Sequence, residues 1–362
     1  MDLFRHFDRI HTLCGIKIFS TKPTIISKII FAHLVFVVNA IFVARASRLL
    51  AMGHLMHEVD HIVLYTSSLY YLCHNYRKRQ LMKEFLIKAR QLLSISEVQR
   101  LRRFSLKLIV FLLTPIAIDN AYAVKTYLDM ATGSWRGALD IYAARKLSPA
   151  VASLPLPVKL TLVLYRHLFT TASNFCIVLM ALIYIFVVAS VQAATRRFLV
   201  NLTKNVLPRR PRLVWLDLMQ LRSELDEALF SLYPTFTFAF FFIETQATVL
   251  MTVHGGSYTM SASHLASYLS FWLESAAITL YVVLVIENAN AENQTIFEQI
   301  ERKTIYSRNV EVQMLVEHIR RTLPFNYTAW SLFTIDKSII LGFASALVSF
   351  TLLFLQLNGV SP

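Results

Sequence analysis

The sequence predicts an all-α membrane protein with seven transmembrane helices, a cytoplasmic N-terminus and an extracellular C-terminus. Three observations lead to this prediction. The chain of 362 residues is 56% hydrophobic but only 16% charged, whereas soluble domains contain about 25% charged residues. Seven apolar stretches are each long enough to cross a bilayer, and Lys and Arg gather on one side of them. Only eight Gly and ten Pro interrupt the chain, which favours long helices.

The expected spans are each about 20 residues or longer. The second is the weakest, because Glu58, Asp60 and His61 lie in its first turns. The fourth and sixth continue into polar sequence without a helix breaker, so we expect these two helices to project beyond the membrane. The seven spans are residues 25–46, 55–75, 106–128, 160–190, 232–253, 264–286 and 336–357.

The distribution of positive charge orients these spans. With the N-terminus inside, the four cytoplasmic regions hold 27 of the 36 Lys and Arg residues, and the outer connections hold five. This bias predicts an inner N-terminus and an outer C-terminus. The formal net charge of +14 then belongs to the inner leaflet and the cytosol, which argues against a nucleic-acid partner.

The N-terminal segment and the cysteines fit the same topology. Residues 1–24 are expected to form a cytoplasmic N-terminus, and the first apolar run is expected to start translocation without a separate signal peptide. Cys14, Cys73 and Cys176 all lie outside the predicted outer loops, so free thiols are expected rather than an extracellular disulfide framework.

The last span sorts its side chains by size and polarity. At about 100° per residue, five small or polar residues project within about 40° of one direction, and bulky residues such as Phe343 and Phe354 project the opposite way. Either a close helix–helix contact or a water-lined pore explains such a stripe. The amide of Gln356, near the outer end of the span, favours the pore. The stripe consists of Ser338, Gly342, Ser345, Ser349 and Gln356.

Two inner segments have amphipathic helical patterns. In residues 287–323, Val312, Leu315, Val316 and Ile319 recur at helical spacing among balanced charges. Residues 212–230 have a similar pattern of Leu among acidic residues. Both are expected to form helices of a cytoplasmic anchor, covering residues 287–335 in the second half of the chain. The alternative is that these helices only pack on their own subunit.

Residues 25–286 are expected to hold a ligand pocket in their outer half. Ionisable side chains inside spans are costly and need a partner or a cavity, and aromatic walls with a few polar groups are typical of small-molecule sites. Solvation, ion pairing and packing at the membrane interface are the alternatives for each residue. The candidates are Asp119, Tyr122, Tyr165, His167, Phe241, Glu244, Tyr268, Phe271, Trp272 and Glu274.

Other chemistries find little support in the sequence. His54, His57, Glu58 and His61 have spacings that zinc sites use, but His residues at a membrane interface are commonly solvated, so no metal is expected. No nucleophile elbow, phosphate loop or dinucleotide fingerprint is present. Neither an enzyme nor a cofactor is therefore expected.

The C-terminal region resembles the signature of arthropod gustatory receptors. That signature has an aliphatic-Asp-Lys/Arg-Ser element, and here it is Ile335-Asp336-Lys337-Ser338. The family span ends in Thr-Tyr, five hydrophobic residues and Gln-Phe; here it ends in Ser349-Phe350, five residues and Gln356-Leu357. The spacing is kept, Gln is identical and the other three positions are altered. The preceding cytoplasmic segment is similar too, so the resemblance covers about 70 residues, while the seven-span arrangement covers the chain.

The resemblance implies a ligand-gated, nonselective cation channel, in which four subunits surround one pore in the plasma membrane of a gustatory neuron. Residues 336–362 would then be the pore-lining span and a short outer tail, with Gln356 and Leu357 near the extracellular mouth. The partners would be a small-molecule tastant, membrane lipid and other receptor subunits, in a homo- or heterotetramer. Two alternatives stay open: an odorant-receptor-like subunit that needs a co-receptor, and a secondary transporter using Asp119, Glu244 and Glu274.

Overall fold

The computed structural model is almost entirely helical. It describes residues 25–36, 39, 55–147, 149–204, 210–225, 232–235, 238, 239, 242, 245, 262–304, 310–323, 327–329 and 333–357. Within this part of the chain, the only strands are β1 (Thr328–Ala329) and β2 (Phe333–Thr334), which pair antiparallel. The all-α fold class is therefore confirmed, apart from this small hairpin.

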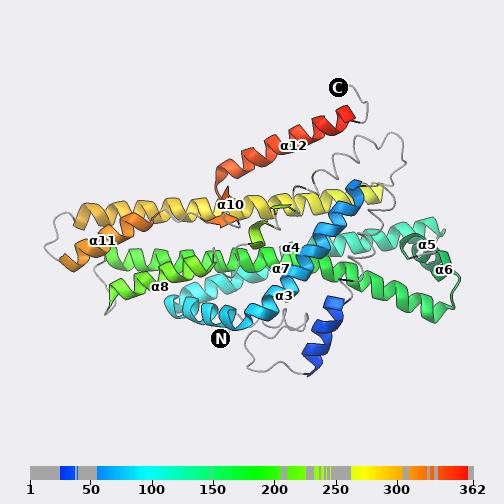
Figure 1. Cartoon of the computed structure of the whole chain (residues 1–362), viewed down its shortest axis with the longest axis horizontal. Helices are drawn as coiled ribbons and strands as arrows, with labels where there is room; N and C mark the ends of the chain where they lie inside the picture. Colours follow the sequence, from blue (N-terminus) through cyan, green and yellow to red (C-terminus); the bar gives the residue numbers. More distant parts are fainter. Residues whose placement is uncertain are drawn as a thin grey trace.

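Four long helices form the bundle. They are α3 (Leu55–Leu92), α4 (Ile95–Met130), α7 (Leu156–Thr203) and α10 (Ala262–Thr304). Helices α7 and α10 lie along the long axis of the molecule, and α3 crosses them obliquely (Figure 1). Both α7 and α10 continue without interruption past residues 190 and 286, as expected from the absence of Gly and Pro there. A shorter helix covers Ile25–Phe36. Most of the expected fifth span lies outside the described residues.

Helices α3 and α4 extend beyond the second and third predicted spans. Helix α3 continues 17 residues beyond 75, and α4 begins at Ile95 instead of residue 106, so the basic region between them is a helical hairpin. A capping box starts α4: Glu97 N donates to Ser94 Oγ (3.2 Å), and Ser94 N donates to Glu97 Oε2 (2.6 Å). This cap satisfies two backbone donors at the turn, which lets both helices extend to within a few residues of each other.

The connection between α4 and α7, which is predicted to lie on the outer side, is helical as well. It contains α5 (Trp135–Lys146) and α6 (Pro149–Ala152). Lys159 at the start of α7 is buried and forms an ion pair with Asp140 of α5. This contact fixes the connection to the bundle.

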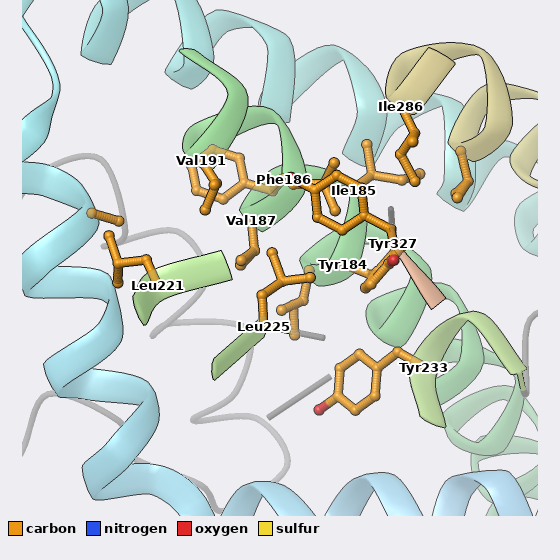
Figure 2. Packing of buried hydrophobic residues seen from close by; sticks show 14 of the residues in the cluster. Tyr184, Ile185, Phe186, Val187, Val191, Leu221, Leu225, Tyr233, Ile286 and Tyr327 are labelled. Carbon is orange, nitrogen blue, oxygen red and sulfur yellow. The ribbon is translucent and has the colours of Figure 1, made fainter. Parts of the chain in front are cut away.

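The core is built around the second half of α7. Every residue from Leu179 to Val188 is buried. Figure 2 shows side chains of α7 facing Ile286 of α10, Tyr233, and Tyr327 from the segment before α12 (Lys337–Leu357). Among the described residues, Leu179–Thr203 is the one helical stretch long and apolar enough to cross a membrane, and most of it is buried inside the protein. The seven-span count and the orientation of the termini thus stay predictions.

Other parts of the bundle expose many large apolar side chains. They lie along α4, the first half of α7 and the first half of α10, where a soluble protein would present polar residues. Examples are Val110, Phe111, Val124, Leu160, Leu164, Leu273 and Leu284.

The second halves of the long helices carry two short helices, α8 (Pro211–Ser223) and α11 (Val310–Thr322). Trp215 of α8 is fully buried against Phe198 of α7, with ring centroids 5.4 Å apart. Leu315, Val316 and Ile319 of α11 are buried in the same chain, so this part of the predicted stripe packs within its own subunit. Arg320 of α11 pairs with Glu301 of α10. Cys73 and Cys176 do not form a disulfide within the described residues, and Cys176 is buried.

We predict that Ser94→Ala loosens the start of α4, because it removes the acceptor for Glu97 N. Loss of an N-cap costs about 1 kcal/mol, so the first-turn amides should exchange about fivefold faster in hydrogen–deuterium exchange on the full chain. Ser94→Thr keeps the hydroxyl and serves as the control. Equal exchange in wild type and Ser94→Ala would show that the cap does not hold this end.

Candidate functional site

Helix α12 leaves the bundle at its base and projects away from α10 (Figure 1). Its bounds agree with the predicted last span of 336–357. Ser338, Gly342, Ser345 and Ser349 of the polar stripe are all exposed in the single chain. On the other side of the helix, Ile339 is buried and Ile340 is half-buried. The side chains of Gln356 and Leu357 lie outside the described residues.

The exposed face of α12 is wider than the polar stripe. Leu341, Val348 and Leu352 are exposed and flank the stripe. A Cβ atom built at Gly342 would meet no atom within 4 Å, and Ser349 Oγ donates to Ser345 O (2.9 Å). The upper part of α12 therefore presents small polar and large apolar groups together, which a single chain leaves uncovered.

The four residues that begin α12 each make a structural contact. Ile335 is buried, and its N–H donates to Tyr327 O (2.7 Å). Asp336 is the N-cap, because its Oδ1 accepts from Ser338 N (2.8 Å) and from the Ser338 hydroxyl. Lys337 Nζ lies 3.7 Å from Glu287 Oε2 of α10. Glu287 Oε1 also accepts from Lys337 N (3.3 Å), a first-turn donor with no intrahelical partner. Ser338 is thus part of a helix cap as well as of the stripe.

A buried amide cluster joins α7, α10 and the segment before α12. We use this name for Gln192, Asn290, Asn293 and the hydroxyl of Tyr327. Gln192 Nε2 donates to Tyr327 OH (3.1 Å) and to Asn290 Oδ1 (3.4 Å), while Asn293 Nδ2 donates to Gln192 Oε1 (2.7 Å). Gln192, Asn293 and Tyr327 are all buried. Since unpaired amides are costly in such surroundings, the cluster fixes how the three segments meet.

The buried amide cluster is not among the features predicted from the sequence. Asn290 and Asn293 are three residues apart on α10, a spacing that places both on one helix face. That pair, together with Gln192 just after the most apolar part of α7, is the signal that the sequence contains.

The structure describes two of the ten candidate ligand residues in contact with partners. Tyr165 OH lies 2.9 Å from His33 Nε2, which joins α7 to the helix over Ile25–Phe36. Trp272 Nε1 donates to Thr245 Oγ1 (2.9 Å), and Thr245 is buried. Both contacts link segments distant in sequence. The structure does not bring the two residues together in one described pocket.

The other candidates cannot be placed against one another. On α4, α7 and α10 the backbone is described but the side chains are not, and two residues lie outside the described part altogether. The first group is Asp119, Tyr122, His167, Tyr268, Phe271 and Glu274, and the second is Phe241 and Glu244. Within the described residues there is no group of three or more His, Cys, Asp or Glu residues that could hold a metal.

We predict that Tyr327→Phe destabilises the protein, because it removes the acceptor of a buried Gln192 N–H. The cost should be about 1–3 kcal/mol, seen as a lower thermal midpoint for the full chain in detergent. Tyr281→Phe is the matched control, since its hydroxyl makes no hydrogen bond to a described residue. A midpoint unchanged by Tyr327→Phe would mean that the cluster does not contribute to stability.

Comparisons with known proteins identify the fold. No protein-family model matches the chain, and no curated protein matches its sequence. The solved structure of the insect olfactory receptor OR5 from Machilis hrabei is similar over 99% of both chains, with a TM-score of 0.69 and 10% identity. The structure of the same receptor in complex with eugenol gives a TM-score of 0.68 at 10% identity, over 99% of this chain and 98% of that one. This chain therefore has the fold of an insect olfactory receptor.

Proposed function

We propose that this chain is a chemoreceptor subunit of a ligand-gated, nonselective cation channel, with α12 lining the pore. The observation that carries the proposal is the state of α12 in a single chain. The helix is anchored at its base by Ile339 and Glu287, yet its stripe of Ser and Gly is exposed together with large apolar side chains. A helix of this kind needs neighbouring subunits on one side and water on another.

Large apolar side chains are exposed along α4, the first half of α7 and the first half of α10, and we call this surface the apolar belt. It supports a multi-pass membrane location. Side chains such as Val110, Phe111 and Leu284 are exposed along helices that also carry the predicted spans. The Lys and Arg residues cluster at the opposite ends of those helices. We propose that this membrane is the plasma membrane, with the N-terminus on the cytoplasmic side.

The assembly is proposed to be a tetramer, either of this chain alone or with related subunits. Apart from α12, apolar residues on α8 and α11 are exposed and available for a neighbouring subunit. They are Leu213, Leu216, Val310 and Met314. Their position at the ends of the long helices suits an anchor that holds the subunits together below the membrane.

The ligand is proposed to be a small organic molecule that binds in the outer half of spans two to six. OR5 was solved with eugenol, which supports a small molecule as the class of ligand. Trp272 and Tyr165 are the described candidates for the pocket wall, because each combines an aromatic surface with a polar contact.

Two sensory roles are proposed, each on one observation. The C-terminal element Ile335-Asp336-Lys337-Ser338 and the terminal Gln356 favour a gustatory receptor. The similarity of the whole fold to OR5 favours an odorant-receptor-like subunit equally. In either role the chain is proposed to work as a channel, not as an enzyme.

Gating is proposed to pass from the ligand through α10 to α12. Helix α10 contacts the base of α12 through Glu287 and Lys337, and it contacts Tyr327 through the buried amide cluster. Movement of α10 would therefore tilt the start of α12 and widen the ring near Gln356. A ligand drives this change only by the amount by which it prefers the open state, and equivalent subunits multiply that preference.

The experiment is current recording from cells that express the full chain, alone and with an odorant co-receptor. Sugars, bitter alkaloids, amines and eugenol are applied in turn. A ligand-evoked, poorly selective cation current that Gln356→Ala alters in selectivity or rectification supports the channel. If the cells instead take up the ligand without any evoked current, and Gln356→Ala leaves this uptake unchanged, the result would support a transporter. Current only with the co-receptor would favour the odorant-like role.

We predict that cysteines on the stripe are modified from the pore. Ser345→Cys and Ser349→Cys should allow a charged methanethiosulfonate reagent to block the ligand-evoked current, because both side chains are exposed on one face of α12. The control is Ala346→Cys, which is half-buried and lies about 100° around the helix from Ser345. Block at all three positions, or at Ala346→Cys alone, would contradict the assignment of this face to the pore.

A further inference from the structure

A cavity of about 260 Å³ lies between α4, α7 and α10, away from the outer half in which the tastant pocket is expected. Its walls combine rings, aliphatic groups and charges. Phe104 of α4 and Tyr281 of α10 stack there, with centroids 5.9 Å apart and planes at 23°. Gln192 and Asn293 of the buried amide cluster also line it, and so do Arg100 and Arg196.

The cavity spans the boundary between the apolar belt and the polar ends of the helices. On α4, exposed Arg100 lines the cavity, and exposed Leu106 and Val110 lie beyond its last lining residue on this helix, with exposed Lys107 between them. On α10, exposed Leu284 lies on the belt side and exposed Glu292 on the polar side. Phe104 and Tyr281 stack on each other at the apolar end of the cavity, so α4 and α10 meet there. On the proposed orientation, this is the level of the headgroups of the inner leaflet.

The charged side chains that line the cavity differ in whether they have hydrogen-bond or ion-pair partners. Glu97 accepts hydrogen bonds from Ser94 in the capping box. Glu292 pairs with Arg196 at 2.7 Å. Among the described residues, none of the ion pairs involves Arg100. One guanidinium is thus available to an anion, and a second is held by an exposed carboxylate that a phosphate could replace.

We propose that this cavity binds the headgroup of an anionic phospholipid of the inner leaflet. Arg100 and Arg196 would contact its phosphate, and its acyl chains would lie along the exposed apolar side chains of α4 and α10. The volume is below the roughly 300–1,000 Å³ of pockets for drug-sized ligands, so it suits a headgroup and not a whole lipid. The proposal rests on the proposed membrane orientation and is independent of channel activity.

The test is native mass spectrometry of the purified full chain in detergent, with dioleoyl phosphatidylserine or dioleoyl phosphatidylcholine added. Wild type should retain phosphatidylserine over phosphatidylcholine. Each basic residue near an anionic surface contributes roughly a fivefold change in binding. Arg100→Gln should therefore lower phosphatidylserine retention about fivefold, and Ala193→Leu should lower it by filling the cavity. Arg103→Gln removes the same charge outside the cavity and should have little effect.

Glu292→Gln gives a change of opposite sign, which a misfolded variant cannot imitate. This substitution frees Arg196 from its carboxylate partner, so phosphatidylserine retention should rise by a few fold. Millimolar sodium phosphate is added in a separate arm and should not displace the lipid, because the acyl chains contribute to binding.

Three results would overturn the proposal. Equal losses in Arg100→Gln and Arg103→Gln would mean diffuse attraction to a basic surface. Equal retention of the two lipids would mean that the charge is not recognised. Displacement by inorganic phosphate would mean a simple anion site. Thermal unfolding of each variant confirms that the chain is folded, and ligand-evoked current is not needed for any arm.

Discussion

The structure depends on the hydrogen bonds that Gln192 makes inside the bundle. Its amide joins α7 to Asn290 and Asn293 of α10 and to the hydroxyl of Tyr327, and the side chains of Gln192, Asn293 and Tyr327 are all buried. Because the partners come from three segments, only one arrangement of those segments satisfies them all. The α7–α10 contact and the start of α12 are therefore fixed by the same small group of polar atoms. Apolar packing surrounds this group but does not by itself specify the register of one helix against the other.

The element that begins α12 gives a physical reason for its residue types. A buried aliphatic side chain at 335 and a carboxylate at 336 set the entry angle and cap the helix, while Lys337 reaches Glu287 on α10. The ion pair between Lys337 and Glu287 lies at the surface and adds little stability on its own. Its backbone contact matters more, since Glu287 also accepts from the N–H of Lys337. These contacts attach the base of α12 firmly while its upper part is uncovered, which suits a helix that moves as a lever about its base.

The sequence predicted the features that depend on composition and periodicity, but not those that depend on distant pairing. Helices α7 and α10 were expected to run on because no Gly or Pro follows residues 190 and 286, and the bounds of α12 agree with the predicted span. The α3–α4 hairpin was not predicted, although Ser94 and Glu97 form a readable cap signal, because hydropathy locates only the apolar part of each long helix. The buried amide cluster joins residues about a hundred positions apart, and no local pattern reports such a pairing. The stripe on α12 was visible from its period, whereas the residues that hold its base were not.

An uncovered helix and a firmly attached base are two consequences of one requirement. If α12 packed along its length on its own chain, its small polar face would be unavailable to a pore, and neighbouring subunits would add nothing to its stability. If its base were free, ligand binding elsewhere in the bundle would have no mechanical route to it. Joining α12 to α10 through Glu287 and through Tyr327 meets both conditions, because the two contacts lie at one end of the helix. The cavity between α4, α7 and α10 shares Gln192 and Asn293 with that joint. A headgroup bound there would therefore act on the same polar atoms that connect the bundle to α12, and membrane composition and ligand would bias one common element.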